Sequence, residues 1–327
     1  MIHEANNRDI WNGFVREHAS RSGAFLQSWE WGEFQRAAGH RVRRVVASDD
    51  RGPSVAAQFV ENALPFGPRY LYCPRGPVSR PDASDLLSTL LSAVAGKSGA
   101  LFIRFEPEAD FQFQSSHFKL VRSVSPANTF ITDLSLTFDD LSRNLHAKTR
   151  YNVGLAERKG VTADLSSDAF GEAWKLFEAT ALRGQFRLHP RRYYERMLSA
   201  LSSDTCRAFL AVARLNGTMI AANIMIDHGG TRTYLHGASA NVHRDAMAPY
   251  LLHWSLVNEA KHRGMHWYDW WGVAPEGSTD AHPWAGITRF KLGFGGTRLN
   301  FPGTLDFVAR PTLYALYSFL RRSRRNR

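Results

Sequence analysis

Short runs of apolar and polar residues predict the first strands of the chain. The runs at residues 41–48 and 54–62 flank the turn sequence DDRGP, so together they predict a β-hairpin. A further strand is predicted over residues 69–78, where aromatic and apolar residues are frequent. Residues 82–96 then show apolar positions at helical spacing, and residues 100–108 predict another strand.

The same order of elements returns later in the chain. The runs at residues 208–215 and 218–227 are joined by Asn216 and Gly217, a pair that suits a two-residue hairpin turn. The elements predicted after this hairpin are a strand over 231–239, a helix over 247–262 and a strand over 265–273. Hairpin, strand, helix, strand is the order of an acyltransferase core of the GNAT type. The repeat therefore predicts a duplicated mixed α/β (α+β) unit.

The repeat also suggests where the domains begin and end. We expect a first GNAT-like domain over residues 1–135, a second over 136–305, and a basic C-terminal helix or tail over 306–327 that packs back on the first domain. Near the start of the second domain, residues 138–161 predict one helix that ends at Gly160.

Composition places the chain among cytoplasmic globular proteins. It has 327 residues, 44% of them hydrophobic and 22% charged, and no apolar run approaches the roughly 20 residues that span a bilayer. The first residues lack the basic and apolar regions of an export signal. The two cysteines, Cys73 and Cys206, are far apart and show no metal-binding spacing. We therefore expect a soluble protein of a reducing compartment.

The net charge of +11 points to an anionic partner. Of the 41 basic residues only seven are lysines, and guanidinium groups bind phosphate in a bidentate fork. Compositional bias of the genome is an alternative explanation for the arginine content. The charge supports a phosphorylated or nucleic-acid partner without identifying it.

Four phrases of the sequence together resemble the FemABX family of peptidoglycan-bridge aminoacyltransferases. They are FLQSWEWGEFQ at residues 25–35, TRYNVGLAERKGV at 149–161, the segment 234–260, and YDWWGV with RFKLGFGG between 268 and 296. The resemblance implies tandem GNAT-like domains and transfer of an amino acid from aminoacyl-tRNA to the stem peptide of a muropeptide precursor, without CoA. The long helical arm of some members is not indicated, since no segment has the length or heptad pattern for a coiled coil.

The implied reaction is aminolysis of an activated ester, which mainly requires alignment and stabilisation of an oxyanion. A family lysine in the RFKLGFGG phrase is implicated in catalysis, so Lys291 is the first candidate, with a surface lysine on a glycine-rich strand as the alternative. Phe290 could stack on the terminal adenine of tRNA, and Arg289 adds a cation. Asp269 could orient the amine or accept its proton, unless it is a structural carboxylate.

Candidate residues for binding the precursor come from both halves of the chain. The family binds the precursor diphosphate with a lysine near the first motif, but this chain has Gln35 followed by Arg36 there. Trp29 and Trp31 could form a wall of this site or belong to the core. Further candidates, with exposed helix faces or core positions as alternatives, are Tyr72, Arg75, Arg187, Arg191, Arg192, Tyr193 and Tyr194.

Other basic residues suit phosphates of the precursor or of tRNA. Lys148, Arg150 and Tyr151 form one basic motif, and His243 and Arg244 precede the predicted helix over 247–262. A CoA-dependent enzyme usually has a glycine-containing loop before this helix, where the pyrophosphate binds, but SANVHRDAMA has no glycine. We expect no cofactor and no metal, because the 13 histidines show no HExxH spacing.

Two other functions fit parts of this pattern. An acyl-CoA-dependent N-acyltransferase that acts on a sugar, peptide or polysaccharide amine would share the fold. A non-catalytic RNA-binding protein would use the basic surface.

The C-terminal tail suggests contact with the inner face of the cytoplasmic membrane, where precursors are lipid-linked rather than nucleotide-linked. Its apolar residues between Leu313 and Leu320 and the arginines that follow are the basis for this expectation. Packing of this helix on the first domain is the alternative.

Overall fold

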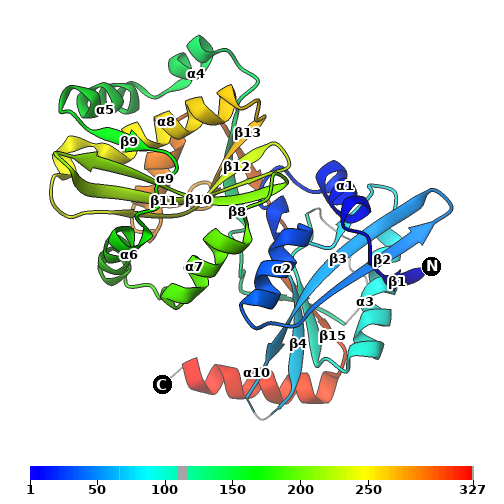
Figure 1. Cartoon of the computed structure of the whole chain (residues 1–327). Coiled ribbons are helices and arrows are strands. Elements are labelled where there is room, and N and C mark those ends of the chain that lie inside the picture. Colours follow the sequence, from blue (N-terminus) through cyan, green and yellow to red (C-terminus); the bar gives the residue numbers. More distant parts are fainter. Residues whose placement is uncertain (66, 109–116, 326–327) are drawn as a thin grey trace. The chain divides into compact units, whose positions relative to one another are not determined.

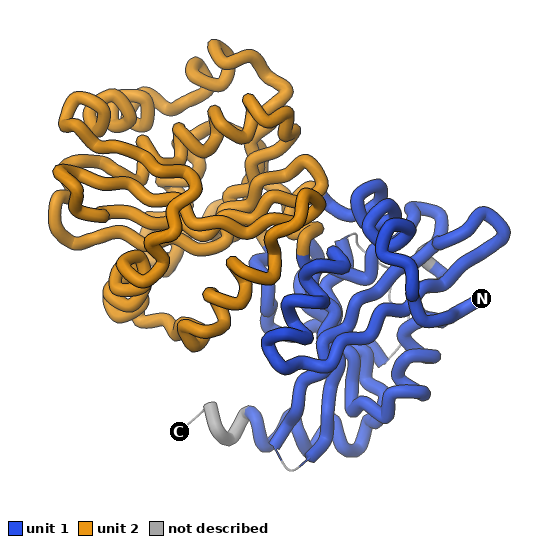
Figure 2. The backbone as a smooth tube through the Cα atoms, in the orientation of Figure 1, with its two compact units in different colours: residues 1–20, 26–127, 301–327 blue, residues 21–25, 128–300 orange. Residues whose placement is uncertain are grey.

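The computed structural model describes residues 1–65, 67–108 and 117–325 and divides into two compact units. Unit 1 contains residues 1–20, 26–127 and 301–327, and unit 2 contains residues 21–25 and 128–300 (Figure 2). The division differs from the expected boundaries at three places. The first part of unit 1 ends at residue 127 and not at 135, residues 301–305 belong to unit 1, and residues 21–25 belong to unit 2.

Unit 1 is a sheet with helices on both faces (Figure 1). Its strands run in the order β1 (Ile2–Glu4), β2 (Val42–Asp49), β3 (Gly52–Ala63), β4 (Arg69–Cys73), β6 (Phe102–Phe105), β15 (Thr304–Val308) and β7 (Phe118–Val121), and β5 (Val78–Ser79) pairs with β3. The other elements are α1 (Arg8–His18), η1 (Ala24–Gln27), α2 (Trp29–Ala37), α3 (Ser84–Ser98) and α10 (Pro311–Arg325).

Alternation along the central strands of unit 1 explains its two cores. On β2, Val45 and Ala47 pack with leucines of α3, whereas Val46 between them packs with Trp11 and Phe14 of α1. Successive side chains of a strand point to opposite faces, so a nearly continuous apolar run is buried on both sides.

Unit 2 has a second sheet with helices on both faces. Its strands run in the order β14 (Thr297–Asn300), β8 (Asn128–Asp133), β13 (Trp267–Gly272), β12 (Thr231–Ser239), β11 (Thr218–His228), β10 (Cys206–Leu215) and β9 (Thr162–Asp164). Helices α5 (Ala147–Arg158) and α8 (Ala248–His262) cover one face, and α6 (Phe170–Gly184) and α7 (Arg191–Ala200) cover the other (Figure 1). The remaining elements are α4 (Phe138–Asn144), η2 (Arg244–Ala246) and α9 (Ala285–Leu292).

Both units contain the predicted order of hairpin, strand, helix and strand. In unit 1 the hairpin β2–β3 is followed by β4, α3 and β6, and β4 pairs with β6 in parallel. In unit 2 the hairpin β10–β11 is followed by β12, α8 and β13, and β12 pairs with β13 in parallel. The predicted mixed α/β class and duplication are confirmed. Among the described residues, no helix is longer than the fifteen residues of α8.

The sheet of unit 1 is completed by the last strand of the chain. Strand β15 follows β14 of unit 2 in sequence but lies between β6 and β7 of unit 1. Strand β8 follows β7 in sequence and begins the continuous segment 128–300 of unit 2, where it lies between β13 and β14. Unit 1 therefore depends on a strand that comes after the whole of unit 2 in sequence.

The single helix predicted over residues 138–161 is wrong in one respect, because the structure divides it into α4 and α5. Leu145 between them has an extended conformation (φ −62°, ψ 132°) and is buried in the core of unit 2. The next residue, His146, donates its N–H to the carbonyl of Gly293 and caps α5 with its side chain. Burial of Leu145 and the bond to Gly293 outweigh the local helical preference.

Candidate functional site

The two parallel strands of unit 2 diverge, and a lysine lies between them. Strands β12 and β13 pair only from Thr231 to Thr233 and from Trp267 to Asp269. Lys291 of α9 donates from Nζ to the carbonyl oxygen of Gly272 at the end of β13, at 2.7 Å. The same Nζ lies 5.2 Å from the ring centroid of Tyr234 on β12. The lysine thus joins the two strands where their own hydrogen bonds end.

Burial gives Lys291 an unusual electrostatic state. Its side chain is only 6% exposed, and this burial lowers the pKa of the amine from 10.5 to about 8, although the nearby Asp269 acts in the opposite direction. The alternative of a surface lysine on a glycine-rich strand is wrong, because the residue is buried and helical. Shifted pKa values of this size are common in active sites and are also found in structural ion pairs.

Asp269 is fully buried behind the lysine. Its Oδ2 accepts from Ser22 Oγ at 2.9 Å and from Thr233 Oγ1 at 3.3 Å, and its Oδ1 accepts from the backbone N–H of Trp271 at 2.8 Å. Trp271 has a left-handed backbone (φ 61°), at the irregularity between Asp269 and Gly272 in the pairing of β13 with β8. Asp269 therefore holds the end of β13 in place and adds negative charge near Lys291.

A histidine that the sequence did not single out lies near Lys291. His253 of α8 is buried, with its ring centroid 4.3 Å from that of Tyr234. The amide of Asn223 donates to Nε2 at 3.1 Å, so Nδ1 carries the proton and donates to Tyr268 Oη at 2.7 Å. Burial first, and the charge of Lys291 second, lower the pKa of His253 to about 3. The ring is neutral and fixed in one tautomer.

A pocket of about 400 Å³ lies at the N-terminus of α8. It is lined by Ile220, Ser239, Ala240, Val242, His243, Arg244, Asp245, Met247, Ala248, Pro249, Tyr250 and Phe290. His243 and Met247 both have left-handed backbones, with φ of 53° and 55°, and the short η2 lies between them. Exposed basic groups at a helix N-terminus favour a phosphate, since the helix dipole and free N–H groups act in the same direction.

Phe290 connects this pocket to the lysine. Its ring lines the pocket and packs on Tyr250, Phe294 and His253, with centroid distances of 4.9, 5.3 and 5.5 Å. The neighbouring Arg289 is instead exposed and lies 3.6 Å from Asp280. Phe290 therefore lines the pocket next to the buried Lys291, whereas Arg289 does not line it.

The glycines after Lys291 serve packing within the chain. A Cβ on Gly293 would lie 2.3 Å from Thr149 Oγ1, and one on Gly296 would lie 2.1 Å from the carbonyl oxygen of Ile131. Gly295 and Gly296 also have positive φ values of 78° and 145°. These glycines let α9 and the residues after it approach α5 and β8 closely.

The residues of the basic motif at the start of α5 differ in their contacts. Arg150 donates from Nη1 to the carbonyl oxygen of Ser142 at 2.8 Å, so it caps the end of α4. Lys148 and Tyr151 are exposed on the surface of the same helix, and Arg158 lies over the Tyr151 ring at 5.8 Å. All three residues are exposed, but the guanidinium of Arg150 is held at the end of α4, whereas Lys148 and Tyr151 are directed toward solvent.

The arginine and tyrosine cluster surrounds the start of α7. Arg187, Arg191 and Arg192 are exposed, and Arg191 forms an ion pair with Glu195 at 2.8 Å. Tyr193 is half-buried and stacks on His189 at 4.2 Å, whereas Tyr194 belongs to the core, where its ring lies 5.2 Å from that of His236. Of the two tyrosines, only Tyr193 is available to a ligand.

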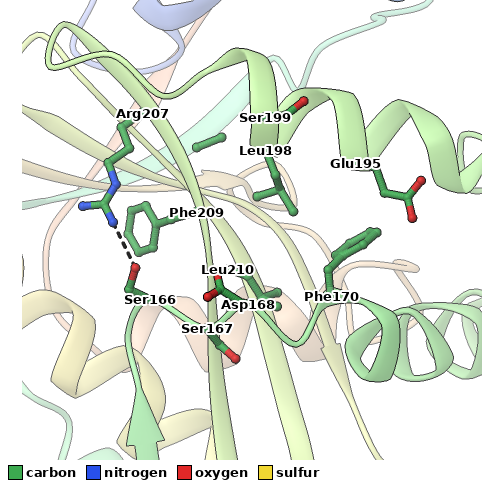
Figure 3. Close-up of a pocket in the computed structure, with 11 residues that line it drawn as sticks. Ser166, Ser167, Asp168, Phe170, Glu195, Leu198, Ser199, Arg207, Phe209 and Leu210 are labelled. Atoms are coloured by element: carbon green, nitrogen blue, oxygen red, sulfur yellow. Dashed lines mark hydrogen bonds between the residues drawn. The ribbon is translucent and has the colours of Figure 1, made fainter.

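A second pocket of unit 2, of about 430 Å³, lies beside α7 and the edge of β10 (Figure 3). Arg207 donates from Nη2 to Ser166 Oγ across its rim at 3.0 Å. It is lined by Ser166, Ser167, Asp168, Phe170, Glu195, Leu198, Ser199, Arg207, Ala208, Phe209 and Leu210. None of the residues singled out in the sequence lines this pocket in the part of the chain that the structure describes.

In unit 1, the corresponding pair of parallel strands also ends in polar groups. Arg75 follows β4, is buried with a left-handed backbone (φ 47°), and donates from Nη2 to the carbonyl oxygen of Pro126 at 2.7 Å. Its backbone N–H donates to Glu106, a buried carboxylate after β6 that the sequence did not single out. Tyr72 lies 3.2 Å from Ser125 Oγ, and burial raises the pKa of its hydroxyl well above the usual value.

The first motif forms α2 of unit 1. Trp31 is buried against Phe34, with ring centroids 5.0 Å apart, and therefore belongs to the core. Trp29 is partly exposed and carries the Arg44 guanidinium 3.8 Å from its ring centroid. Arg36 is exposed and forms an ion pair with Glu33 at 2.9 Å. Trp29 and Arg36 are thus the residues of this motif that reach the surface.

Two further features of the described residues concern metal binding and membrane crossing. Within residues 1–65, 67–108 and 117–325, no group of three or more histidine, cysteine or acidic side chains is arranged to hold a metal ion. In the same residues, no helix is both long and apolar enough to cross a membrane.

Comparison with known proteins gives one consistent result. The model of the FemAB family matches residues 8–137, 109–218 and 214–322. The chain is 25% identical over 296 residues to the UDP-N-acetylmuramoylpentapeptide-lysine N(6)-alanyltransferase of Weissella viridescens, covering 83% of this chain and 85% of that one. It is 22% identical over 391 residues to the lipid II:glycine glycyltransferase of Staphylococcus aureus (strain USA300), covering 93% and 92%.

Solved structures agree in fold. The crystal structure of FemX superposes with a TM-score of 0.82 at 20% identity and covers 97% of this chain and 99% of its own. A tandem GNAT protein from the clavulanic acid pathway gives a TM-score of 0.55 at 12% identity and covers 94% and 98%. The predicted tandem GNAT-like architecture is confirmed.

Proposed function

Because the chain belongs to the FemAB family, we propose that it is an aminoacyltransferase of peptidoglycan-bridge synthesis. It takes an amino acid from aminoacyl-tRNA and attaches it to an amine on the stem peptide of a muropeptide precursor. The names of the two relatives support the acceptor class, since one acts on a UDP-linked muramoylpentapeptide and the other on lipid II.

The observation that carries this proposal is the buried lysine at the divergence of β12 and β13. Attack of the amine on the ester carbon forms the new amide bond and develops negative charge on the carbonyl oxygen. Collapse of this intermediate breaks the ester bond, so tRNA leaves with a free hydroxyl at its 3′ end and the proton lost by the amine passes to it, directly or through solvent. A cation fixed in a site of low dielectric stabilises such an oxyanion strongly, because it needs no reorganisation during the reaction. Lys291 is held by the Gly272 carbonyl and the Tyr234 ring, so in the proposed reaction its charge faces the carbonyl oxygen of the ester.

The pocket at the N-terminus of α8 is the proposed site of the 3′ end of tRNA. His243 and Arg244 would bind the terminal phosphates, and Phe290 would stack on the terminal adenine next to Lys291. The sequence between Ser239 and Ala248 contains no glycine, so the loop lacks the feature by which CoA enzymes bring backbone N–H groups to a pyrophosphate. No cofactor is needed for this reaction.

The precursor is proposed to bind through its diphosphate. Arg187, Arg191 and Arg192 around α7 supply exposed guanidinium groups, and Tyr193 lies beside them. In unit 1, Trp29, Arg36, Tyr72 and Arg75 remain separate candidates for contact with a substrate. Asp269 accepts hydrogen bonds from Ser22, Thr233 and Trp271, and its role in the reaction is proposed to act through the charge on Lys291.

The proposed place of action is the cytoplasm, with peripheral contact at the inner face of the membrane when the precursor is lipid-linked. This agrees with the substrate in the name of the Staphylococcus aureus relative. Both precursor forms carry a diphosphate, so the same arginines would serve either one.

A comparison of donors and acceptors tests the function. Purified protein is incubated with a mixture of radiolabelled aminoacyl-tRNAs or with labelled acetyl-CoA, each with a UDP-linked or a lipid-linked muropeptide. We expect label to move from aminoacyl-tRNA to one of the two precursors and none to move from acetyl-CoA. Transfer from acetyl-CoA alone, or RNA binding without any transfer, would overturn the proposal.

A further inference from the structure

One side of α10 carries exposed apolar residues although the helix is held in place by its other side. Leu313, Leu316, Phe319 and Leu320 are 46, 55, 67 and 44% exposed. Tyr314 and Tyr317 instead pack on Phe102 of β6, each with a centroid distance of 5.4 Å, and Tyr314 donates to Asp306. The helix is therefore attached to unit 1 (Figure 1), and its exposed side chains still present apolar surface.

The exposed residues form one continuous stripe. At about 100° per residue, the four side chains fall within an arc of about 120°, and the two tyrosines fall outside this arc, with Tyr317 next to Leu313. Unit 1 covers the side of the helix that carries the tyrosines. The four residues of the stripe stay 44 to 67% exposed in the described part of the chain.

Charge decides what kind of surface fits the stripe. After Asp306 the sequence has no acidic residue and six arginines, namely Arg310, Arg321, Arg322, Arg324, Arg325 and Arg327. Arg310 and Arg321 are exposed at the two ends of the stripe, and the side chains beyond Arg321 lie outside the described residues. RNA would satisfy the arginines but would leave leucine and phenylalanine in water. A bilayer with anionic headgroups satisfies both.

We propose that the stripe Leu313, Leu316, Phe319 and Leu320 docks α10 in the plane of an anionic lipid surface, with the arginines bound to lipid phosphates. Such a helix lies at the boundary of headgroups and acyl chains and binds reversibly. This proposal rests on the proposed function, because it names the residues that would make the membrane contact. Because its test involves no transfer reaction, either proposal can fail without the other.

Sedimentation with vesicles tests the stripe. The full chain is mixed with vesicles of phosphatidylcholine alone or with one third phosphatidylglycerol, at physiological salt. We expect binding only to the anionic vesicles and at least tenfold weaker binding for the Leu316→Glu/Phe319→Glu variant. The matched control is Leu120→Glu/Leu182→Glu, which places the same charges on two other exposed leucines, 73 and 83% exposed. Equal binding by the two double variants would overturn the proposal.

A variant labelled with a dye makes the test independent of whether the Leu316→Glu/Phe319→Glu variant is stable. Cys73 and Cys206 are both buried, so an environment-sensitive dye reacts with the new thiol of Leu316→Cys, and Leu182→Cys is the control. We expect the emission of the first to shift to shorter wavelength with anionic vesicles and that of the second to stay unchanged. A shift with a short RNA duplex, but none with vesicles, would show that the stripe is an RNA surface and would contradict the proposal.

Discussion

At the scale of single residues, Lys291 shows how a functional group can lower the stability of its own unit. Its pKa falls from 10.5 to about 8 on folding, because burial disfavours the charged amine. The unfolded chain therefore binds more protons between these two values, and stability rises with pH across this window. Below about pH 8 both states are protonated and the full penalty of about 3 kcal/mol applies.

This penalty predicts the behaviour of Lys291→Met. Methionine keeps most of the side-chain volume and removes the charge, so we expect its free energy of unfolding to exceed that of the wild type at pH 7 by about 1 to 3 kcal/mol. The gain should shrink as the pH rises toward 10.5. Urea unfolding at pH 7 and pH 10 measures both values. A variant that is less stable than the wild type at pH 7 would show that the lysine is a structural ion-pair partner.

The arginines at the start of α7 give a second prediction. Arg191→Ala with Arg192→Ala should weaken binding of the muropeptide precursor about tenfold or more and change tRNA binding much less, because the pair is assigned to the diphosphate. Arg196→Ala, an exposed arginine on the same helix, is the matched control. Affinities come from calorimetry with each ligand alone. Equal losses for precursor and tRNA would count against the assignment.

At the scale of elements, the sequence predicted the strands and turns whose conformation depends on neighbouring residues. The hairpin β10–β11 was predicted because Asn216 and Gly217 favour its turn, and both adopt the left-handed conformation that it requires. The sequence did not predict the break at Leu145 or the helical form of α9, since both depend on partners distant in sequence. His253 was missed for the same reason, because its partners Asn223 and Tyr268 lie on strands far from it in the chain.

The packing glycines allow a test at this scale. Gly296→Ala should destabilise the protein by about 2 kcal/mol or more, since its φ of 145° and the Ile131 carbonyl both exclude a side chain. Gly286→Ala is the control, because it lies in α9 with no neighbour within 4 Å of the added Cβ, so it should be neutral or stabilise by up to about 1 kcal/mol. Thermal unfolding of both variants provides the comparison. Similar melting temperatures would contradict the proposed close packing.

At the scale of the whole molecule, the return of β15 to the first sheet makes unit 1 depend on the end of the sequence. Strand β15 lies between β6 and β7, where Asp306 forms two hydrogen bonds of 2.8 Å with the buried Arg104. Sequence periodicity predicted the duplicated units, and the four phrases predicted the family, which the comparison confirmed. Neither could indicate that the last strand returns to the first sheet, because strand pairing over such a distance leaves no local pattern.

The return of β15 to unit 1 predicts the effect of truncation. A chain that ends at Asn300 leaves Arg104 buried without its carboxylate and β6 and β7 without their shared neighbour, so unit 1 should not fold. A chain that ends at Leu320 keeps β15 and should unfold like the full chain. Hydrogen exchange of β2, β3 and β6 distinguishes the two. Full protection of these strands in the shorter chain would contradict the proposed dependence.

The central claim is that the buried charge of Lys291 stabilises the transition state of aminoacyl transfer. The direct measurement is the single-turnover rate of transfer from aminoacyl-tRNA to the precursor at saturating concentrations of both, for the wild type and for Lys291→Ala. The account predicts a rate at least about 100-fold lower in the variant, with tRNA affinity nearly unchanged, as expected when one preorganised charge is lost at an oxyanion. A folded variant that transfers at a rate close to that of the wild type would contradict it.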